Sequence, residues 1–154
     1  MSPEEIRKAH RRFAVECNNR AWDLIGQPTR SPAENREMLL AAHAAAFHWS
    51  KVGTPLNDMR AEVLLAHAQA LLGQGAEALR YAQQVLTFCE NNPCEDWDLA
   101  FAYLEMALAS WAMKDPAGHG KYFALAQTQG SAVKDAEDRA VFQTELARVP
   151  QPAD

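Results

Sequence analysis

Apolar residues recur at intervals of three and four along most of this chain. Met38, Ala42, Ala45, Trp49 and Val52 are one example, since each step between them is three or four residues. This spacing places side chains on one face of an α-helix. No stretch shows the strict alternation of apolar and polar residues that indicates a half-buried strand. The pattern predicts an all-α protein.

Proline, glycine and polar cap residues divide the apolar pattern into segments. Ser2-Pro3 and Ser31-Pro32 are typical helix starts, because serine can accept a bond from the first free N–H groups and proline fits the first turn. Gly53, Gly73 and Pro93 are typical breaks. These signals predict about seven helices, over residues 2–24, 32–52, 56–72, 76–91, 95–113, 116–130 and 134–148. Their short connections predict antiparallel neighbours.

The segment 95–113 differs from the others because it is apolar nearly all round. Only Glu105 interrupts the apolar residues in its middle. A helix that is apolar on every side is buried on every side. We therefore expect this helix at the centre of the domain, with Trp111 in the core. Trp22, Trp49 and Trp97 are also expected in the core, unless one or two of them line a ligand pocket.

Length and composition indicate one folded domain. The chain has 154 residues, of which 48% are hydrophobic and 23% charged. Both fractions are ordinary for a globular protein, and this length can bury a substantial core. The polar, proline-containing end predicts a domain over residues 1–149 followed by a tail over 150–154.

Charge and cysteine content exclude some classes of function. The formal net charge is -5, which argues against a nucleic-acid-binding protein, because these usually carry a basic face. The basic stretch 7–12 is interpreted as a solvated helix face, or else as a docking patch for an acidic partner. The longest apolar run, 38–49, is shorter than the about 20 residues that span a membrane. Three cysteines and a polar start without a secretory signal favour the cytoplasm.

Two helix–turn–helix units carry a resemblance to a known family. Small residues at Ala66 and Ala107 lie in the first helix of each unit, Gly73 lies in a turn, and Ala78 begins a second helix. The region 59–130 resembles tetratricopeptide repeats, in which small residues at such positions allow two helices to pack closely. Ala66 and Ala107 are 41 residues apart, whereas that repeat usually has 34.

The resemblance implies antiparallel helix pairs stacked as a short right-handed superhelix. It also implies a concave groove that binds a protein or peptide, which can be a second copy of the chain. The first prediction for function is therefore a non-enzymatic interaction module or scaffold. The alternative is a small-molecule-binding protein, or an enzyme, with a pocket between the second, third and fifth helices.

No arrangement of residues predicts catalysis, a cofactor or a metal. His43 and His48 lie about 140° apart around a helix, so they do not converge. Ser131 and Lys134 have the spacing of some acyl-transfer enzymes, but the partner motifs are missing. The carboxylates are interpreted as scattered over surface faces. The remaining candidates for a groove or ligand site are His43, His48, Trp49 and His67.

Overall fold

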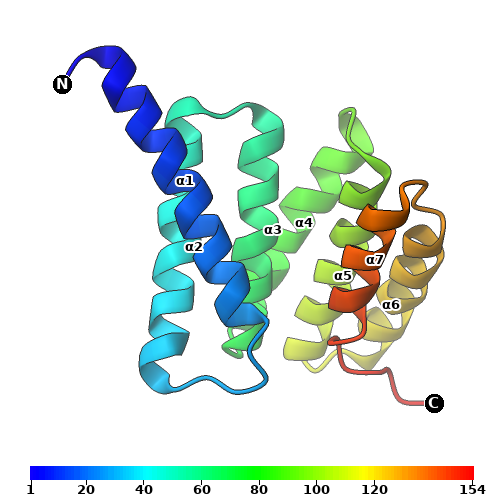
Figure 1. Ribbon diagram of the computed structural model, residues 1–154. Helices are drawn as coiled ribbons and strands as arrows, with labels where there is room; N and C mark the ends of the chain where they lie inside the picture. Colours follow the sequence, from blue (N-terminus) through cyan, green and yellow to red (C-terminus); the bar gives the residue numbers. More distant parts are fainter.

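All regular structure in the protein is helical. Figure 1 shows a computed structural model that describes residues 1–154. The helices are α1 (Pro3–Ile25), α2 (Pro32–Val52), α3 (Pro55–Leu71), α4 (Gly75–Asn91), α5 (Asp96–Ala112), α6 (Pro116–Ser131) and α7 (Ala136–Leu146). Each end lies within two residues of the end that the sequence predicts.

The helix starts agree with the sequence because the cap residues form the expected bonds. The Ser2 hydroxyl accepts from the Glu5 N–H at 3.2 Å, while the Glu5 carboxylate accepts from the Ser2 N–H at 2.6 Å. Ser31 and Glu34 repeat this reciprocal arrangement at the start of α2. Such a capping box satisfies N–H groups that have no partner inside the helix.

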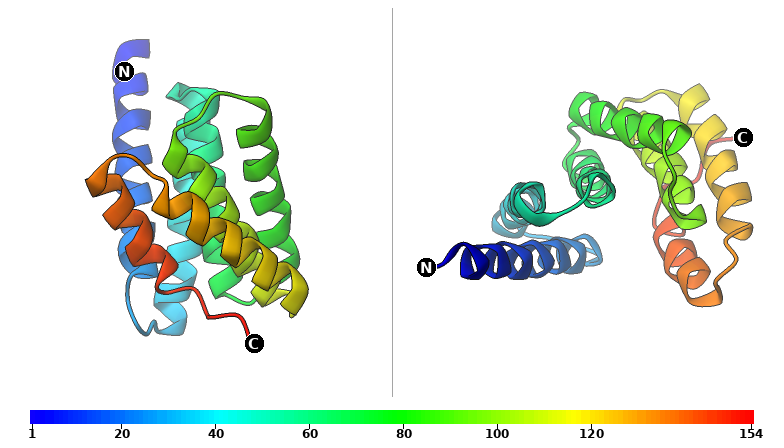
Figure 2. Two further views of the ribbon diagram at one scale, coloured as in Figure 1. Left: turned by 90° about the vertical axis from the view of Figure 1, so that its right-hand side faces the viewer. Right: turned by 90° about the horizontal axis from the view of Figure 1, so that it is seen from above.

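The helices form antiparallel pairs that stack side by side. Helix α1 packs on α2, α3 on α4 and α5 on α6, and each pair contacts the next. Helices α1, α3, α5 and α7 also contact one another in that order. Seen from above, the stack curves, and α1 and α7 lie at the two ends of the curve (Figure 2). The prediction of an all-α fold of stacked antiparallel helix pairs is confirmed.

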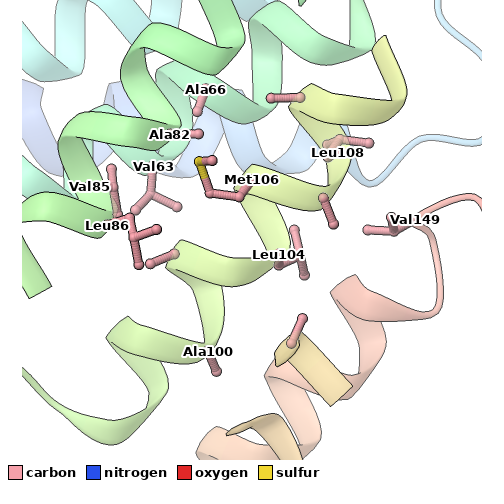
Figure 3. Packing of buried hydrophobic residues seen from close by; sticks show 14 of the residues in the cluster. Val63, Ala66, Ala82, Val85, Leu86, Ala100, Leu104, Met106, Leu108 and Val149 are labelled. Carbon is pink, nitrogen blue, oxygen red and sulfur yellow. The ribbon is translucent and has the colours of Figure 1, made fainter. Parts of the chain in front are cut away.

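Helix α5 lies at the centre, as predicted. The larger core cluster contains 21 buried residues, and α5 contributes to it along most of its length. The side chain of Met106 on α5 lies beside Ala66 and Ala82 of the preceding pair (Figure 3). A second cluster joins α1, α2 and α3 around Met38 and Leu64. Two clusters sharing α3 connect all the helix pairs into one core.

Small residues set the spacing between helices at two places. A Cβ atom on Gly75 would lie 2.9 Å from the backbone carbon of Ala112, so α4 and α5 approach closely there. A Cβ atom on Gly130 would overlap the ring of Phe142 on α7. Ala107, also on α5, is fully buried. Larger side chains at these positions would force the helices apart.

The prediction that Trp111 belongs to the core is wrong. This side chain remains 44% exposed. Trp111 is one residue from the end of α5, where the chain turns into α6, so the outer side of that last turn has no helix to cover it. Trp22, Trp49 and Trp97 are partly buried against the two core clusters.

The chain beyond α7 keeps contact with the core. Val149 is buried, and Nε2 of His119 lies 2.7 Å from the carbonyl oxygen of Pro150. The imidazole N–H therefore donates to the backbone of the segment that follows α7. None of the seven helices has both the length and the apolar character that crossing a membrane requires.

Candidate functional site

A groove opens on the side of the stack where α1, α3, α5 and α7 lie next to one another. It holds a cavity of about 430 Å³. Its lining residues are Asn18, Trp22, Arg60, Val63, Trp97, Asp98, Phe101, Asp138, Val141 and Glu145. Aromatic walls with a few polar groups are typical of binding pockets, and the volume falls within their usual range of about 300–1,000 Å³.

The periodicity of the α-helix explains why these residues lie on one side of their helices. Asn18 and Trp22 are four residues apart on α1, and Arg60 and Val63 are three apart on α3. On α7 the lining residues are also three and four apart, and on α5 the adjacent Trp97 and Asp98 precede Phe101 by four and three residues. Residues three or four apart lie on one helix face. Each of the four helices therefore turns one stripe toward the groove, and on α3 and α5 this stripe includes the buried side chains of Val63 and Asp98.

An ion pair between a partly exposed arginine and a buried aspartate connects α3 to α5 at the groove wall. Arg60 donates from Nε and Nη2 to the two carboxylate oxygens of Asp98, at 3.0 and 2.9 Å. The Asp98 side chain is only 1% exposed and also accepts from the Glu95 N–H at 3.0 Å. The Arg60 guanidinium lies 4.3 Å from the ring centroid of Trp97. This geometry neutralises the charge of Asp98 and fixes one wall of the groove.

A second pair connects the same helices deeper in the molecule. Nδ1 of His67 lies 2.8 Å from Oε1 of Glu105, and both side chains are almost completely buried. The ring of Trp22, which lines the groove, meets His67 edge-on with 5.3 Å between centroids. Neither His67 nor Glu105 lines the cavity itself. The pair therefore supports the groove from below.

Opposing effects set the protonation of this second pair. Burial alone would lower the pKa of His67, but the charge of Glu105 and the hydrogen bond to it raise that pKa above its ordinary value. Burial raises the pKa of Glu105, against the influence of His67. The charge of Glu145 acts in the same direction on both residues. His67 thus keeps its proton to a higher pH than a free histidine.

Helix α7 brings acidic side chains to the opposite wall. Oε1 of Glu145 accepts from Arg148 at 2.7 Å, while Oε2 of Glu145 is buried and has no hydrogen-bond partner. Asp138 lies about two turns before Glu145 on α7 and is exposed at the groove. The lining residues include three carboxylates; Asp98 is paired with Arg60 and Glu145 with Arg148, so Asp138 is the one without an ion-pair partner. The groove is acidic on its α7 side.

The candidate residues from the sequence do not line this groove. His43 is exposed on α2, and Nδ1 of His48 lies 2.8 Å from Nδ1 of His10. Burial, followed by the charge of His10, lowers the pKa of His48. Trp49 packs on the smaller core cluster, with Arg11 5.8 Å from its ring centroid. None of His43, His48, Trp49 or His67 lines the cavity.

This groove is not the pocket that the sequence offers as an alternative, which stays a prediction. The sequence predicts a pocket between the second, third and fifth helices, whereas α2 contributes no lining residue. The interpretation of the carboxylates as surface groups is wrong for Asp98 and Glu105, which are 1% and 0% exposed. One signal was available for Glu105, because a lone acid inside an apolar helix needs a buried partner.

The buried polar groups do not assemble a metal site or a reactive thiol. No three His, Cys, Asp or Glu side chains lie close enough together to hold a metal ion. Burial, with a smaller influence of Cys94, raises the pKa of Cys89 to about 12, so that thiol stays protonated near neutrality.

Comparisons of the chain with known protein families, with curated proteins and with solved structures give no match.

Proposed function

We propose that this protein is a non-enzymatic interaction module that receives an extended segment of a partner protein in the groove between α1, α3, α5 and α7. One observation carries the proposal: four helices contribute lining residues to a single open groove with aromatic walls. The resemblance to tetratricopeptide repeats supports the same use, because in that family a concave groove binds peptides. The partner can be a second copy of the chain.

Two side-chain pairs between α3 and α5 favour a groove that is already formed before a partner binds. Arg60 and Asp98 fix α3 against α5 at the wall, and His67 and Glu105 do the same underneath. A groove that is already formed binds with a smaller loss of conformational entropy. Trp22, Trp97 and Phe101 offer the rigid apolar contacts that contribute most at binding surfaces.

Selection from a displayed library of random ten-residue peptides tests the proposal. Val141 is 61% exposed at the groove, so Val141→Arg should obstruct it without disturbing the core. Leu40→Arg is the matched control, since Leu40 is 59% exposed on α2, which does not line the groove. Peptides selected on the wild type should bind Leu40→Arg equally well and Val141→Arg about tenfold more weakly or worse.

Two results would contradict the interaction module. One is a selection that enriches no peptide, and the other is a set of peptides that bind both variants like the wild type.

The volume of about 430 Å³ also suits a small molecule, which is the second candidate function. Native mass spectrometry of protein purified gently from its own cells separates the two, because a bound small molecule adds a few hundred daltons and a bound polypeptide adds far more.

A further inference from the structure

We infer that the groove recognises a basic side chain, lysine or arginine, within the bound segment, and that Glu145 and Asp138 on α7 are its acceptors. This inference rests on the proposed function, because it specifies the chemistry of the segment that the groove receives. It follows from three observations: the charge distribution across the groove, the unsatisfied buried oxygen of Glu145, and the aromatic walls.

The charges in the groove are distributed unequally between its two walls. On the α5 side, the carboxylate of Asp98 is neutralised by two bonds from Arg60. On the α7 side, Asp138 has no ion-pair partner, and Glu145 uses only one of its two oxygens, for Arg148. An anionic group entering the groove would meet these carboxylates. A cationic group would be attracted to the α7 wall.

One buried side-chain oxygen without a partner also belongs to the α7 wall, namely Oε2 of Glu145. Two buried side-chain polar atoms in the chain have no hydrogen-bond partner, namely Oε2 of Glu105 and Oε2 of Glu145. Glu105 is completely buried, and the charge of Glu145 is close enough to influence its protonation. A buried carboxylate oxygen without a donor is unfavourable, and most such atoms in proteins have a partner. An ammonium or guanidinium group in the groove would supply the missing donor to Glu145.

The aromatic walls match the remainder of a basic side chain. Trp22 and Phe101 line the cavity with 6.4 Å between their ring centroids. Val63 and Val141 add apolar surface from α3 and α7. The methylene stem of lysine or arginine packs on apolar surface while its charged end reaches a polar group, and aromatic faces attract the cation. A bare metal ion would use only the carboxylates and leave these walls uncovered.

The test selects random ten-residue peptides on three proteins: the wild type, the double variant Asp138→Asn/Glu145→Gln, and Glu137→Gln. Glu137 is the matched control, because it is an exposed acid on the same helix that does not line the groove. We expect one position in the wild-type and Glu137→Gln pools to be enriched in lysine or arginine. The double variant should still select peptides, but without this enrichment.

A single peptide from the wild-type pool then gives the magnitude. Replacing its basic residue by norleucine should weaken binding to the wild type by about tenfold, and should leave binding to the double variant nearly unchanged. Asp138→Asn alone serves as a second variant if the double variant unfolds in a circular dichroism melt, because Asp138 is exposed. It should lose part of the preference for basic residues.

The outcomes separate the inference from the proposed function. A wild-type selection that enriches no peptide contradicts the interaction module itself. Enriched peptides that bind at the groove without a preference for basic residues overturn only the basic-side-chain inference. Binding of spermidine that Val141→Arg abolishes, together with no peptide binding, would show that the cation belongs to a small amine and would overturn the peptide source.

Discussion

The buried pair of His67 and Glu105 leads to a test of how α3 and α5 are held together. Substituting Glu105 by methionine removes the carboxylate and leaves the imidazole enclosed, since both side chains are almost completely buried and 2.8 Å apart. Breaking a buried pair by removing one partner costs about 3–5 kcal/mol. For a chain of this length, that loss lowers the melting temperature by roughly 6–20 °C.

The double variant His67→Leu/Glu105→Met separates the interaction from the loss of packing. Replacing both members of a buried pair by apolar residues of similar size is often close to neutral. We therefore expect the free energy of unfolding of the double variant to lie within about 1–2 kcal/mol of the wild type. Urea denaturation of the wild type, both single variants and the double variant completes a double-mutant cycle. Glu137→Met on the surface is the control and should change stability by less than about 0.5 kcal/mol.

The stability of the wild type and that of Glu105→Met should change with pH in opposite directions. In the wild type the pKa of His67 is raised, so its stabilising contribution is complete below pH 6.5 and is lost as the pH rises through the raised value. In Glu105→Met the largest remaining influence is burial, which lowers that pKa. The variant should therefore become more stable as the pH rises toward 6.5, by up to about 1.4 kcal/mol per pH unit. Denaturation between pH 5 and 8.5 measures both curves.

A single result would refute this reasoning. If Glu105→Met unfolds at the same urea concentration as the wild type throughout that pH range, then Glu105 and His67 contribute nothing as a pair. Parallel pH curves with a constant offset would leave the packing loss and remove the electrostatic argument. A double variant as unstable as the sum of the two single variants would do the same.

Three further predictions concern the packing of the helices. Gly130→Ala should destabilise the protein by about 1–3 kcal/mol, because its methyl group would overlap Phe142. Gly120 lies in the same helix with open space around it, so Gly120→Ala should stabilise the protein by about 0.5–1 kcal/mol. Urea denaturation of both variants measures the two changes. Ala107→Leu should cost about 1–3 kcal/mol in the same assay, since Ala107 is fully buried on α5. Trp111→Ala should cost less than about 2 kcal/mol in thermal and urea unfolding, because the ring is 44% exposed, and a loss of the about 3–5 kcal/mol typical of a core tryptophan would contradict that position.

The helices could be predicted from the sequence because their signals are local. Ser2 and Ser31 each lie three residues before a glutamate that completes a capping box, so both helix starts can be read from four residues. The periodic apolar residues then give the buried face of each helix. The central position of α5 follows from the same local rule, because its apolar residues surround it.

The groove could not be predicted because it depends on which residues meet across different helices. His43, His48 and Trp49 are close in the sequence, yet they point to different surroundings on α2. Arg60 and Asp98 are 38 residues apart, and only the relative position of α3 and α5 brings them together. A polar residue in an apolar helix indicates that a partner exists, but the helical periodicity does not identify it.

The two ion pairs between α3 and α5 have the same separation in the sequence, and this bears on which insertions the fold tolerates. Both Arg60–Asp98 and His67–Glu105 join residues 38 positions apart, so α3 and α5 run parallel in a constant register. Both pairs hold that register directly, in addition to the packing of α4 against α3 and α5. Relatives that gain or lose residues in the loop at Asn92-Pro93 can therefore keep both pairs and the same groove. Insertions inside α3 or α5 between the paired residues would separate one pair while keeping the other, and selection should remove them.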